Sequence, residues 1–331
     1  VGDRLLITGT TRQHKPSGTF RASARIGSQT EEMRIASVDG TAIGIERPLR
    51  WAHGMEGPFV AEAANLSRNV VVESADSAKP RGHTMYHRGS RGSISYTEFR
   101  ELGKPGVLGK YSLHFHECRD SMRGSSVIGA SIWNSGNRWI TVHGTDYLVV
   151  RDCVGYNSLG HGFFLEDGTE SFNVFDRNLA VQALSTPPLP KQVLAYDRND
   201  GAGFWWANSN NAFVNNVASE CDEYGYRFDV IASTDFDPKL EVPQRDGSMR
   251  RADIRTLPFL LFESNEAHCQ RRWAINLGGF SGTLRGSVEG VGPDPRRPFV
   301  LRSTRVWNSH WGFHTQSPNV MLDGYRMHSG D

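Results

Sequence analysis

The sequence predicts an all-β fold, a right-handed parallel β-helix that follows a small antiparallel β segment. Three observations support this prediction. Amphipathic stretches with helical spacing are scarce, and short apolar runs are cut by Asn, Gly and Asp instead. A Gly or Arg followed by an aromatic residue recurs at intervals of one or two units of about 20 residues. Short apolar segments that contain Asn or Asp recur between these dipeptides.

The recurring dipeptides indicate stacked coils. In a parallel β-helix no coil can bury its apolar face alone, and stacking at ~4.8 Å lets neighbouring coils satisfy each other's backbone groups. Trp139, Phe163 and Phe204 should then occupy equivalent positions on different coils. A β-sandwich would show regular hairpin dipeptides, and a propeller a steadier four-strand period. The dipeptides are Arg138-Trp139, Gly162-Phe163, Gly203-Phe204, Gly225-Tyr226, Arg272-Trp273 and Gly312-Phe313.

The chain divides into two regions. Residues 1–62 are expected to form the antiparallel segment, because short apolar stretches alternate there with polar turns. Residues 63–331 are expected to form a β-helix of the pectate-lyase-like kind. Pro-rich sequence near 184–191 and sequence rich in Asp, Pro, Lys and Arg near 230–257 interrupt the repeat. Both stretches are predicted to be surface insertions.

Composition excludes several classes of protein. The chain has 37 Lys and Arg against 36 Asp and Glu, so a broad basic face for nucleic acid is not expected. No apolar run approaches the ~20 residues of a membrane span. The chain shows no signal peptide and opens with Val1-Gly2 rather than Met, which indicates a mature or excised fragment. Its four Cys do not make a disulfide framework.

Four ordered runs carry a family resemblance: GKYSLHFHE (109–117), RWITVHGTDYLVVRD (138–152), VGYNSLGHGFFLEDG (154–168) and FWWANSNN (204–211). Together they resemble the central β-helix of the family of the cell-migration-inducing hyaluronidase, transmembrane protein 2 and the fibrocystin proteins. The segments GDRLLI (2–7) and ERPLRWAH (46–53) resemble the end of the eight-glycine domain that precedes that helix. The resemblance covers most of residues 1–230. It implies a secreted or cell-surface protein, extracellular or periplasmic, that acts on or binds carbohydrate.

Five side chains are predicted to hold a divalent cation: His114, His116, His143, His161 and Asp167. Side chains alternate along a strand, so His114 and His116 share one face. Imidazole with carboxylate suits zinc or another transition metal better than calcium, which prefers all-oxygen shells. A polar ladder without a ligand is the alternative for the same residues.

The aromatic positions of the repeat set the alignment of the coils. When the aromatic residue of each dipeptide is aligned with that of the following dipeptide, His143, Asp167 and Asn208 fall at one position, ~5 Å apart on successive coils. Glu166 and Asp167 are adjacent, so on a strand they point to opposite faces, and this alignment assigns Asp167 to the cleft. The column is predicted to bind a metal or sugar hydroxyls, with Asn208 contacting substrate.

Two kinds of polysaccharide cleavage remain open. Hydrolysis needs two carboxyl groups about 5–9.5 Å apart, and Asp229 or Asp222 on following coils could be the partner of Asp167. A lyase needs a base and a cation that neutralises a uronate, and His143 and Arg227 could serve. The residue pattern does not distinguish hydrolysis from lyase cleavage.

Aromatic residues near these columns suit a polysaccharide cleft. Trp206 and Tyr226 are predicted to stack on sugar rings. Core packing is the alternative, because alternation turns about half of such residues inward.

Cys221 and Cys269 fall at matching positions when residues 216–221 are laid on 264–269. Stacked coils would then bring the two cysteines together with facing Cβ atoms, within reach of a disulfide.

These interpretations predict an extracellular β-helix protein, a metal-assisted glycosidase or lyase that acts on an acidic, hyaluronan-like polysaccharide. The alternative is a non-catalytic surface β-helix that binds glycans or a protein, as an adhesin or receptor segment does. The expected partner is a polysaccharide, and nucleic acid is not expected.

Overall fold

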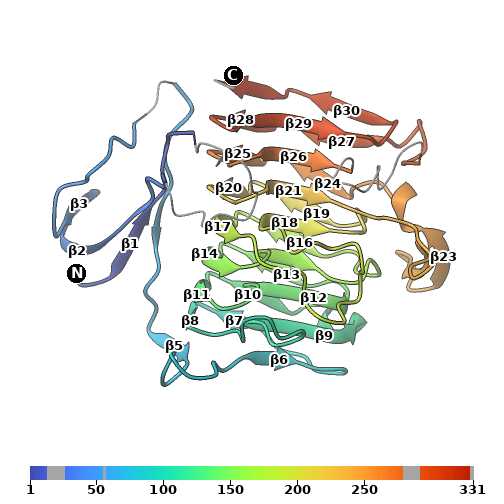
Figure 1. The fold of residues 1–331 in the computed structure, drawn as a ribbon, viewed down its shortest axis with the longest axis horizontal. Helices are drawn as coiled ribbons and strands as arrows, with labels where there is room; N and C mark the ends of the chain where they lie inside the picture. The colour runs from blue at the N-terminus through green and yellow to red at the C-terminus, as the bar shows by residue number, and fades with distance from the viewer. Residues whose placement is uncertain (13–26, 55–56, 279–290, 329–331) are drawn as a thin grey trace.

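The computed structural model describes residues 1–331 except 13–26, 55–56, 279–290 and 329–331. Its main body is a right-handed parallel β-helix, as the repeat predicts, in which three long sheets run along the stack of coils (Figure 1). The sheets are called the β5, β6 and β7 sheets after their first strands. Each coil passes through the sheets in turn, so neighbouring strands of one sheet come from successive coils.

The strands of the three sheets are short and pair in parallel. The β5 sheet contains, in order, β5 (Val70–Glu73), β8 (Thr97–Arg100), β11 (Ser131–Ser135), β14 (Val154–Leu159), β17 (Leu179–Leu184), β20 (Val217–Ser219), β25 (Glu266–His268), β28 (Arg305–Trp307) and β31 (Arg326–His328). The β6 sheet contains β6 (Thr84–Tyr86), β9 (Leu113–Arg119), β12 (Ile140–Thr145), β15 (Phe163–Leu165), β18 (Ala202–Trp206), β21 (Tyr224–Phe228), β26 (Trp273–Leu277) and β29 (Trp311–Thr315). The β7 sheet contains β7 (Ile94–Ser95), β10 (Ser126–Ile128), β13 (Val149–Arg151), β16 (Val174–Asp176), β19 (Ala212–Val214), β24 (Leu261–Glu263), β27 (Phe299–Arg302) and β30 (Val320–Asp323).

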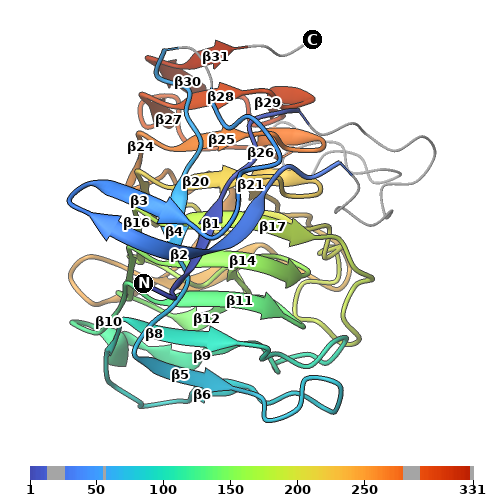
Figure 2. The same ribbon diagram turned by 90° about the vertical axis from the view of Figure 1, so that its left-hand side faces the viewer.

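An antiparallel sheet lies beside the β-helix, on its left in Figure 1 and in front of it in Figure 2. Its strands, in the order β3-β2-β1-β4, are β1 (Arg4–Ile7), β2 (Glu31–Asp39), β3 (Ala42–Ile45) and β4 (Ala63–Asn65). Partly buried polar contacts join it to the β-helix: Glu62 Oε2 lies 2.8 Å from His268 Nε2, and Tyr156 donates to Glu32. In the described part of the chain, no helix has the length and apolar character that a membrane crossing requires.

Two excursions leave the coils, one between β17 and β18, which extends beyond the expected 184–191 stretch, and one between β21 and β24. The segment between β17 and β18 reaches back to the β6 sheet, where its Asp197 contacts Arg138. Between β21 and β24 the chain forms the hairpin β22 (Lys239–Pro243) and β23 (Met249–Asp253), which projects at the right of Figure 1. Short 3-10 turns, η1 (Asp120–Met122) and η2 (Ile254–Thr256), complete the elements.

Stacked aromatic rings form part of the interior. Phe163 and Phe204 are direct partners in neighbouring strands, as predicted, with ring centroids 4.9 Å apart. Trp139 does not share this position, because Ile140 is the partner of Phe163. The Trp139 ring instead packs over Gly162, where a Cβ would come within 2.3 Å of it. The glycine before Phe163 therefore makes room for the tryptophan of the preceding coil.

The same one-residue offset separates the two predicted cysteine partners. Ser219 pairs with His268, which sets Cys221 beside Gln270 and Cys269 beside Glu220. Both cysteines are buried and free. The assumed register is wrong because Asn216 stacks on Asn265 rather than on Ser264, through an amide hydrogen bond of 3.0 Å.

Candidate functional site

The two histidines of the HFH run lie on the outer face of the β6 sheet. In β9, Leu113 and Phe115 point into the core, so His114 and His116 point to the other side. His116 is the direct partner of His143 in β12. Neighbouring coils therefore place three imidazoles on one face, with ring centroids 4.8–6.1 Å apart.

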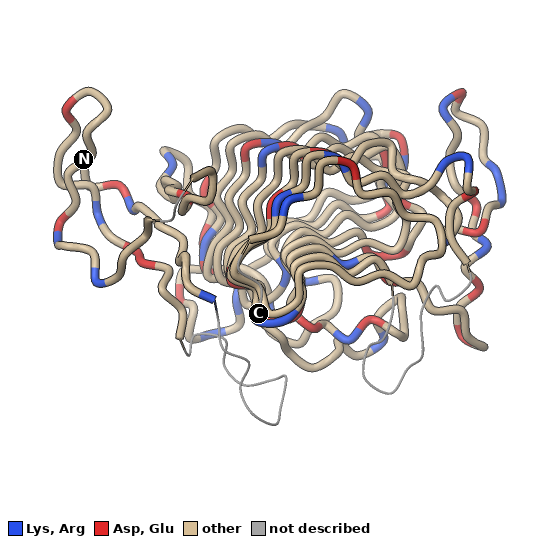
Figure 3. The backbone as a smooth tube through the Cα atoms, turned by 90° about the horizontal axis from the view of Figure 1, so that it is seen from above, with Lys and Arg blue, Asp and Glu red and all other residues tan. Residues whose placement is uncertain are grey.

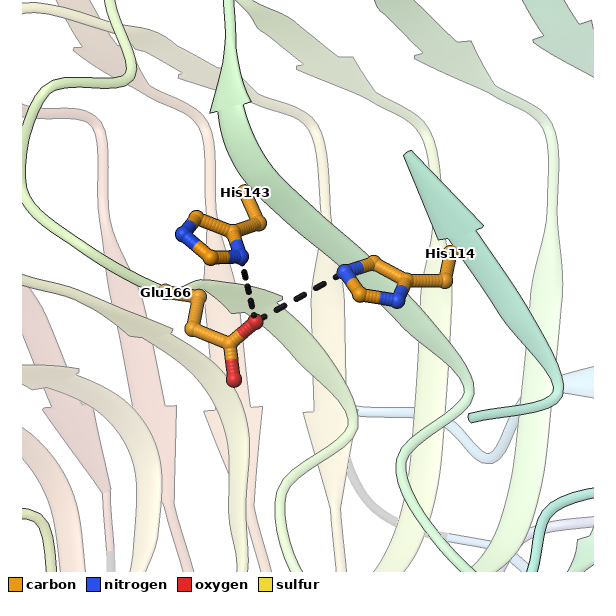
Figure 4. Close-up of side chains that lie close together, drawn as sticks. All are labelled: His114, His143 and Glu166. Carbon is orange, nitrogen blue, oxygen red and sulfur yellow. Dashed lines mark ion pairs between the residues drawn. The ribbon is translucent and has the colours of Figure 1, made fainter. Parts of the chain in front are cut away.

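Glu166 reaches the same place from the next coil. Val142 pairs with Leu165, so the residues that follow them, His143 and Glu166, continue side by side on the outer face. Glu166 Oε2 lies 3.2 Å from His143 Nδ1 and 3.6 Å from His114 Nε2 (Figure 4). The ligand atoms of these three side chains all lie within 4.8 Å of one another. Together they are called the His–Glu cluster.

Asp167, which the sequence alignment assigned to this position, lies beside the His–Glu cluster. The alignment is wrong by one residue because Trp139 does not correspond to Phe163, and a slip of one residue reverses the face of every side chain. Asp167 still contacts His143, with Oδ2 3.3 Å from Nε2, the nitrogen that faces away from Glu166. It does so because the chain turns here: Asp167 Oδ1 accepts hydrogen bonds from the Thr169 backbone at 2.7 Å and its hydroxyl at 2.6 Å.

His161 lies apart from the cluster. Its Nδ1 accepts a hydrogen bond from the Ala202 backbone N–H at 3.0 Å, so the proton is on Nε2, which donates to Asp197 at 2.8 Å. Both ring nitrogens are thus occupied, and the predicted ligand role is wrong for this residue. The ring stacks on Phe164 instead.

Two buried donors hold the other oxygen of Glu166. Tyr111 Oη donates to Oε1 at 2.5 Å, and Arg138 Nη1 donates to it at 3.0 Å. Arg138 is fully buried and also contacts Asp197, at 2.8 Å. These contacts orient the carboxylate so that Oε2 is left facing the two histidines.

Burial and charge shift the pKa values of the cluster in opposite directions. Burial lowers the pKa of His114 to about 4. Burial opposes ionisation of Glu166, but hydrogen bonding to His143 and the charge of Arg138 lower its pKa to about 2. Burial also disfavours a charged His143, but the hydrogen bonds with Asp167 and Glu166 raise its pKa to about 11. At neutral pH, Glu166 is therefore an anion and His114 a neutral imidazole.

A third carboxyl group shapes the turn that carries Asp167. Glu170 Oε1 accepts from the backbone N–H groups of Gly144 and Asp167, at 3.0 and 2.8 Å, and Oε2 accepts from Gly168 at 2.8 Å. Burial and the charge of Asp167 raise the pKa of Glu170 well above its ordinary value. Glu170 thus fixes the loop that positions Asp167 against His143.

The remaining predicted catalytic residues lie farther along the same face. Arg227 of β21 contacts Asp229 at 2.9 Å, and both are buried. Glu166 is on β15's coil, two coils before them, so they do not join the His–Glu cluster. Asn208 is buried in the turn after β18, where its side chain binds Ser171 at 3.1 Å.

Trp206 and Tyr226 belong to the core. Both are fully buried, Trp206 against Phe213 and Tyr226 stacked on Phe204. The predicted role in stacking on sugar rings is wrong for both, because alternation turns them inward. Their outward neighbours are Trp205 and Arg227.

Sequence reasoning missed four residues of the site: Tyr111, Arg138, Glu166 and Asp197. Tyr111, Arg138 and Glu166 stand within the runs that carry the family resemblance, and correct alignment of Ile140 with Phe163 would have selected Glu166. Asp197 comes from the excursion after β17, where no repeat gives an alignment.

The arrangement suits a metal ion with mixed nitrogen and oxygen ligands. A tetrahedral ion with bonds of ~2.1 Å separates its ligand atoms by about 3.4 Å. The two distances to Glu166 Oε2, 3.2 and 3.6 Å, bracket this value. The buried Nε2 of His114 and Nδ1 of His116 have no hydrogen-bond partner in the described part of the chain.

Comparison with known proteins adds a family. Residues 81–275 match the family model described as CEMIP β-helix. The chain is 32% identical to the human cell migration-inducing and hyaluronan-binding protein, over 81% of this chain and 24% of that protein. It is 27% identical to the human cell surface hyaluronidase CEMIP2, over 78% of this chain and 21% of that protein.

A further relative matches a larger share of this chain. Mouse fibrocystin-L is 25% identical over 94% of this chain and 8% of its own length. The chain thus spans about a quarter or less of the curated relatives named here. Among solved structures, the catalytic domain of a GH87 α-1,3-glucanase aligns with 77% of this chain and 58% of its own, with a TM-score of 0.33 and 13% identity.

Proposed function

The chain belongs to the CEMIP β-helix family, and we propose that it is an extracellular protein that cleaves an acidic, hyaluronan-like polysaccharide with a transition metal at the His–Glu cluster. Relatives named as a hyaluronidase and as a hyaluronan-binding protein support the polymer, and the name cell surface hyaluronidase supports the location. Whether the bond is broken by hydrolysis or by elimination stays open.

The observation that carries the metal proposal is the orientation of His114. Its Nδ1 lies 3.1 Å from the carbonyl oxygen of Gly109, which accepts a hydrogen bond and therefore places the proton on Nδ1. Nε2 then presents a lone pair to Glu166 Oε2 across 3.6 Å. Two hydrogen-bond acceptors face each other in a buried place, and a cation between them removes their repulsion.

The surrounding contacts match those of a metal site. A metal-binding histidine usually donates its other N–H to a carbonyl or carboxylate, which fixes the ring. Gly109 does this for His114, and Asp167 is placed to do it for His143 through Nε2. Asp167 is thus proposed to orient a ligand rather than to be one, and Tyr111 and Arg138 orient Glu166 in the same way.

A bound metal would supply a water of lowered pKa and a positive charge beside the reacting bond. The chain's own residues would exclude solvent and hold the ligands, since His114 and Glu166 are 0% and 3% exposed. Access is from the side of His143 and His116, which are half-buried.

Non-catalytic glycan binding is the second candidate, and the burial of His114 and Glu166 favours it as well. In that case Asp167 and Glu166 would simply hold a protonated His143 between them, at 3.3 and 3.2 Å. The polar ladder would then stabilise the coils without any metal.

Metal analysis of the purified chain tests the proposal. We expect about one zinc, manganese or iron per chain, and depolymerisation of hyaluronan that a chelator stops and added metal restores. His143→Ala should abolish metal content and cleavage together, whereas His83→Ala, a histidine outside the cluster, should change neither. A folded wild-type chain that holds no metal after supplementation, and yields no shorter products, would support the ladder.

A further inference from the structure

A second concave surface lies apart from the His–Glu cluster. It is framed by the β22/β23 hairpin, by residues 256–260 that lead into β24, and by residues 296–300 at the start of β27. Its volume is ≈ 1200 Å³. This surface is called the hairpin cleft.

Cations dominate the lining of the hairpin cleft. The lining includes two acids, Asp246 and Asp253, and six basic residues: Lys239, Arg245, Arg250, Arg251, Arg296 and Arg297. Ion pairs neutralise Arg251 through Asp237, at 2.9 Å, and Arg296 through Asp294, at 3.1 Å. Asp253 is neutralised by Arg255, at 2.6 Å.

Four basic side chains remain available to a ligand. Lys239, Arg245, Arg250 and Arg297 are all exposed, and none forms an ion pair with a described residue. Figure 3 shows basic segments interleaved with acidic ones on the hairpin at the right of the molecule. The cations are therefore spaced apart rather than massed.

Apolar and aromatic residues also line the cleft, among them Phe172, Phe259 and Pro298. Phe172 stacks on Tyr147 of the preceding coil, with ring centroids 5.1 Å apart and planes 6° from parallel. Arg123 covers the Tyr147 ring at 3.6 Å. Half-buried aromatic rings beside cations suit a sugar chain, whose apolar faces stack on rings while its acidic groups meet the bases.

The cleft adjoins the segment that carries the candidate catalytic site. Residues 166–172 run from Glu166, in the His–Glu cluster, to Phe172, in the cleft. The hairpin is anchored at this segment, since Tyr147 Oη donates to the Gln244 carbonyl at 3.4 Å and Ile254 packs on Gly168. A polymer bound in the cleft would thus lie next to the segment that carries Glu166 of the His–Glu cluster.

We propose that the hairpin cleft binds a linear acidic polysaccharide, with Lys239, Arg245, Arg250 and Arg297 contacting its charged groups and Phe172 contacting its sugar rings. The class of polymer rests on the proposed function, whereas the charge and the lining do not. Nucleic acid, which carries a charge on every nucleotide, fits less well because acids alternate with the bases and the chain carries a net charge of only +1.

Binding of end-labelled hyaluronan of one fixed length, measured by interferometry, tests this inference. The cleft variant is Arg245→Ser/Arg250→Ser/Arg297→Ser, and the control is Arg34→Ser/Arg50→Ser/Lys79→Ser, which removes three exposed cations elsewhere. We expect affinity to fall about tenfold or more in the cleft variant and less than about twofold in the control. Wild-type binding should also weaken with added salt more steeply than binding by the cleft variant.

A Glu166→Gln variant separates this inference from the proposed function. It should lose cleavage and keep wild-type affinity for hyaluronan. If the wild-type chain cleaves nothing but binds hyaluronan through the cleft, the proposed function fails and the inference stands. Three outcomes would each overturn the inference, whatever happens to cleavage of short oligosaccharides. They are equal losses of affinity in the cleft and control variants, no hyaluronan binding by the wild type, and equal affinity of the wild type for single-stranded DNA of matched charge.

Discussion

The outer face of the β6 sheet carries two groups of buried polar residues that balance charge differently. Over β21 and β26, Arg227 meets Asp229 directly at 2.9 Å and also donates to Asn276. Over β9, β12 and β15, two imidazole nitrogens converge on a single oxygen of Glu166. The first group contains its own cation and anion in contact, whereas in the second the Nε2 lone pair of His114 also faces Glu166 Oε2.

This difference shows that burial of charge does not by itself indicate a functional site. A buried ion pair is stable when each charge meets its partner and the remaining hydrogen bonds are made. Converging acceptors, held in place by Gly109, Arg138 and Tyr111, are costly unless a cation joins them. Under the proposed function, the geometry of the His–Glu cluster therefore calls for an added ion, whereas the Arg227–Asp229 pair needs none.

The largest expected difference concerns metal content. Glu166→Gln and Asp229→Asn remove the same charge from the two groups. Glu166→Gln should reduce bound metal from about one ion per chain to none, because the amide supplies no negative charge. Asp229→Asn should leave it unchanged. Elemental analysis of both dialysed variants is the measurement, and equal metal content in the two would remove the distinction.

The next largest effect should appear in stability, at Arg227. Arg227→Ala leaves Asp229 buried without its cation, so the free energy of unfolding should fall by about 3–5 kcal/mol. Urea denaturation measures this loss, and metal content of the folded variant should stay at the wild-type level. A loss below about 1 kcal/mol would show that the pair is not desolvated as the structure indicates.

Asp167→Asn should have a smaller effect, on metal affinity. The amide can still accept a hydrogen bond from His143 Nε2 but no longer supports the ring with a full charge, so affinity should fall about 10–100-fold. Competition with a chelator of known affinity gives the value. Complete loss of metal would instead make Asp167 a ligand, and an unchanged affinity would remove its orienting role.

The smallest effect should come from an ion pair in water. Arg177 lies 2.8 Å from Asp152, but both side chains are well exposed, 51% and 38%. Arg177→Ala should lower the free energy of unfolding far less than Arg227→Ala does, and urea denaturation of the two variants measures the difference. A cost equal to that of Arg227→Ala would mean that pairing rather than burial sets the energy.

The fold was accessible from the sequence because stacked coils repeat their aromatic and asparagine positions. Phe163 and Phe204 align correctly, and the HFH run places its histidines on one face by alternation alone. The site was less accessible because a repeat predicts register only where the repeat is exact. Aligning Trp139 rather than Ile140 with Phe163 shifted the register by one residue. The position beside His143 was therefore assigned to Asp167 instead of Glu166.

By itself, therefore, the sequence determined the parallel β-helix, the family and the presence of histidines on one face, because these depend on local period and on residue type. Only the tertiary structure decided which atoms meet. The one-residue register between β12 and β15 selects Glu166, the turn at Asp167 breaks alternation, and Asp197 arrives from an excursion outside the repeat. The contacts of His143 with Glu166 and of Arg138 with Asp197 join residues 23 and 59 positions apart, and such contacts are set by how coils stack rather than by any local pattern.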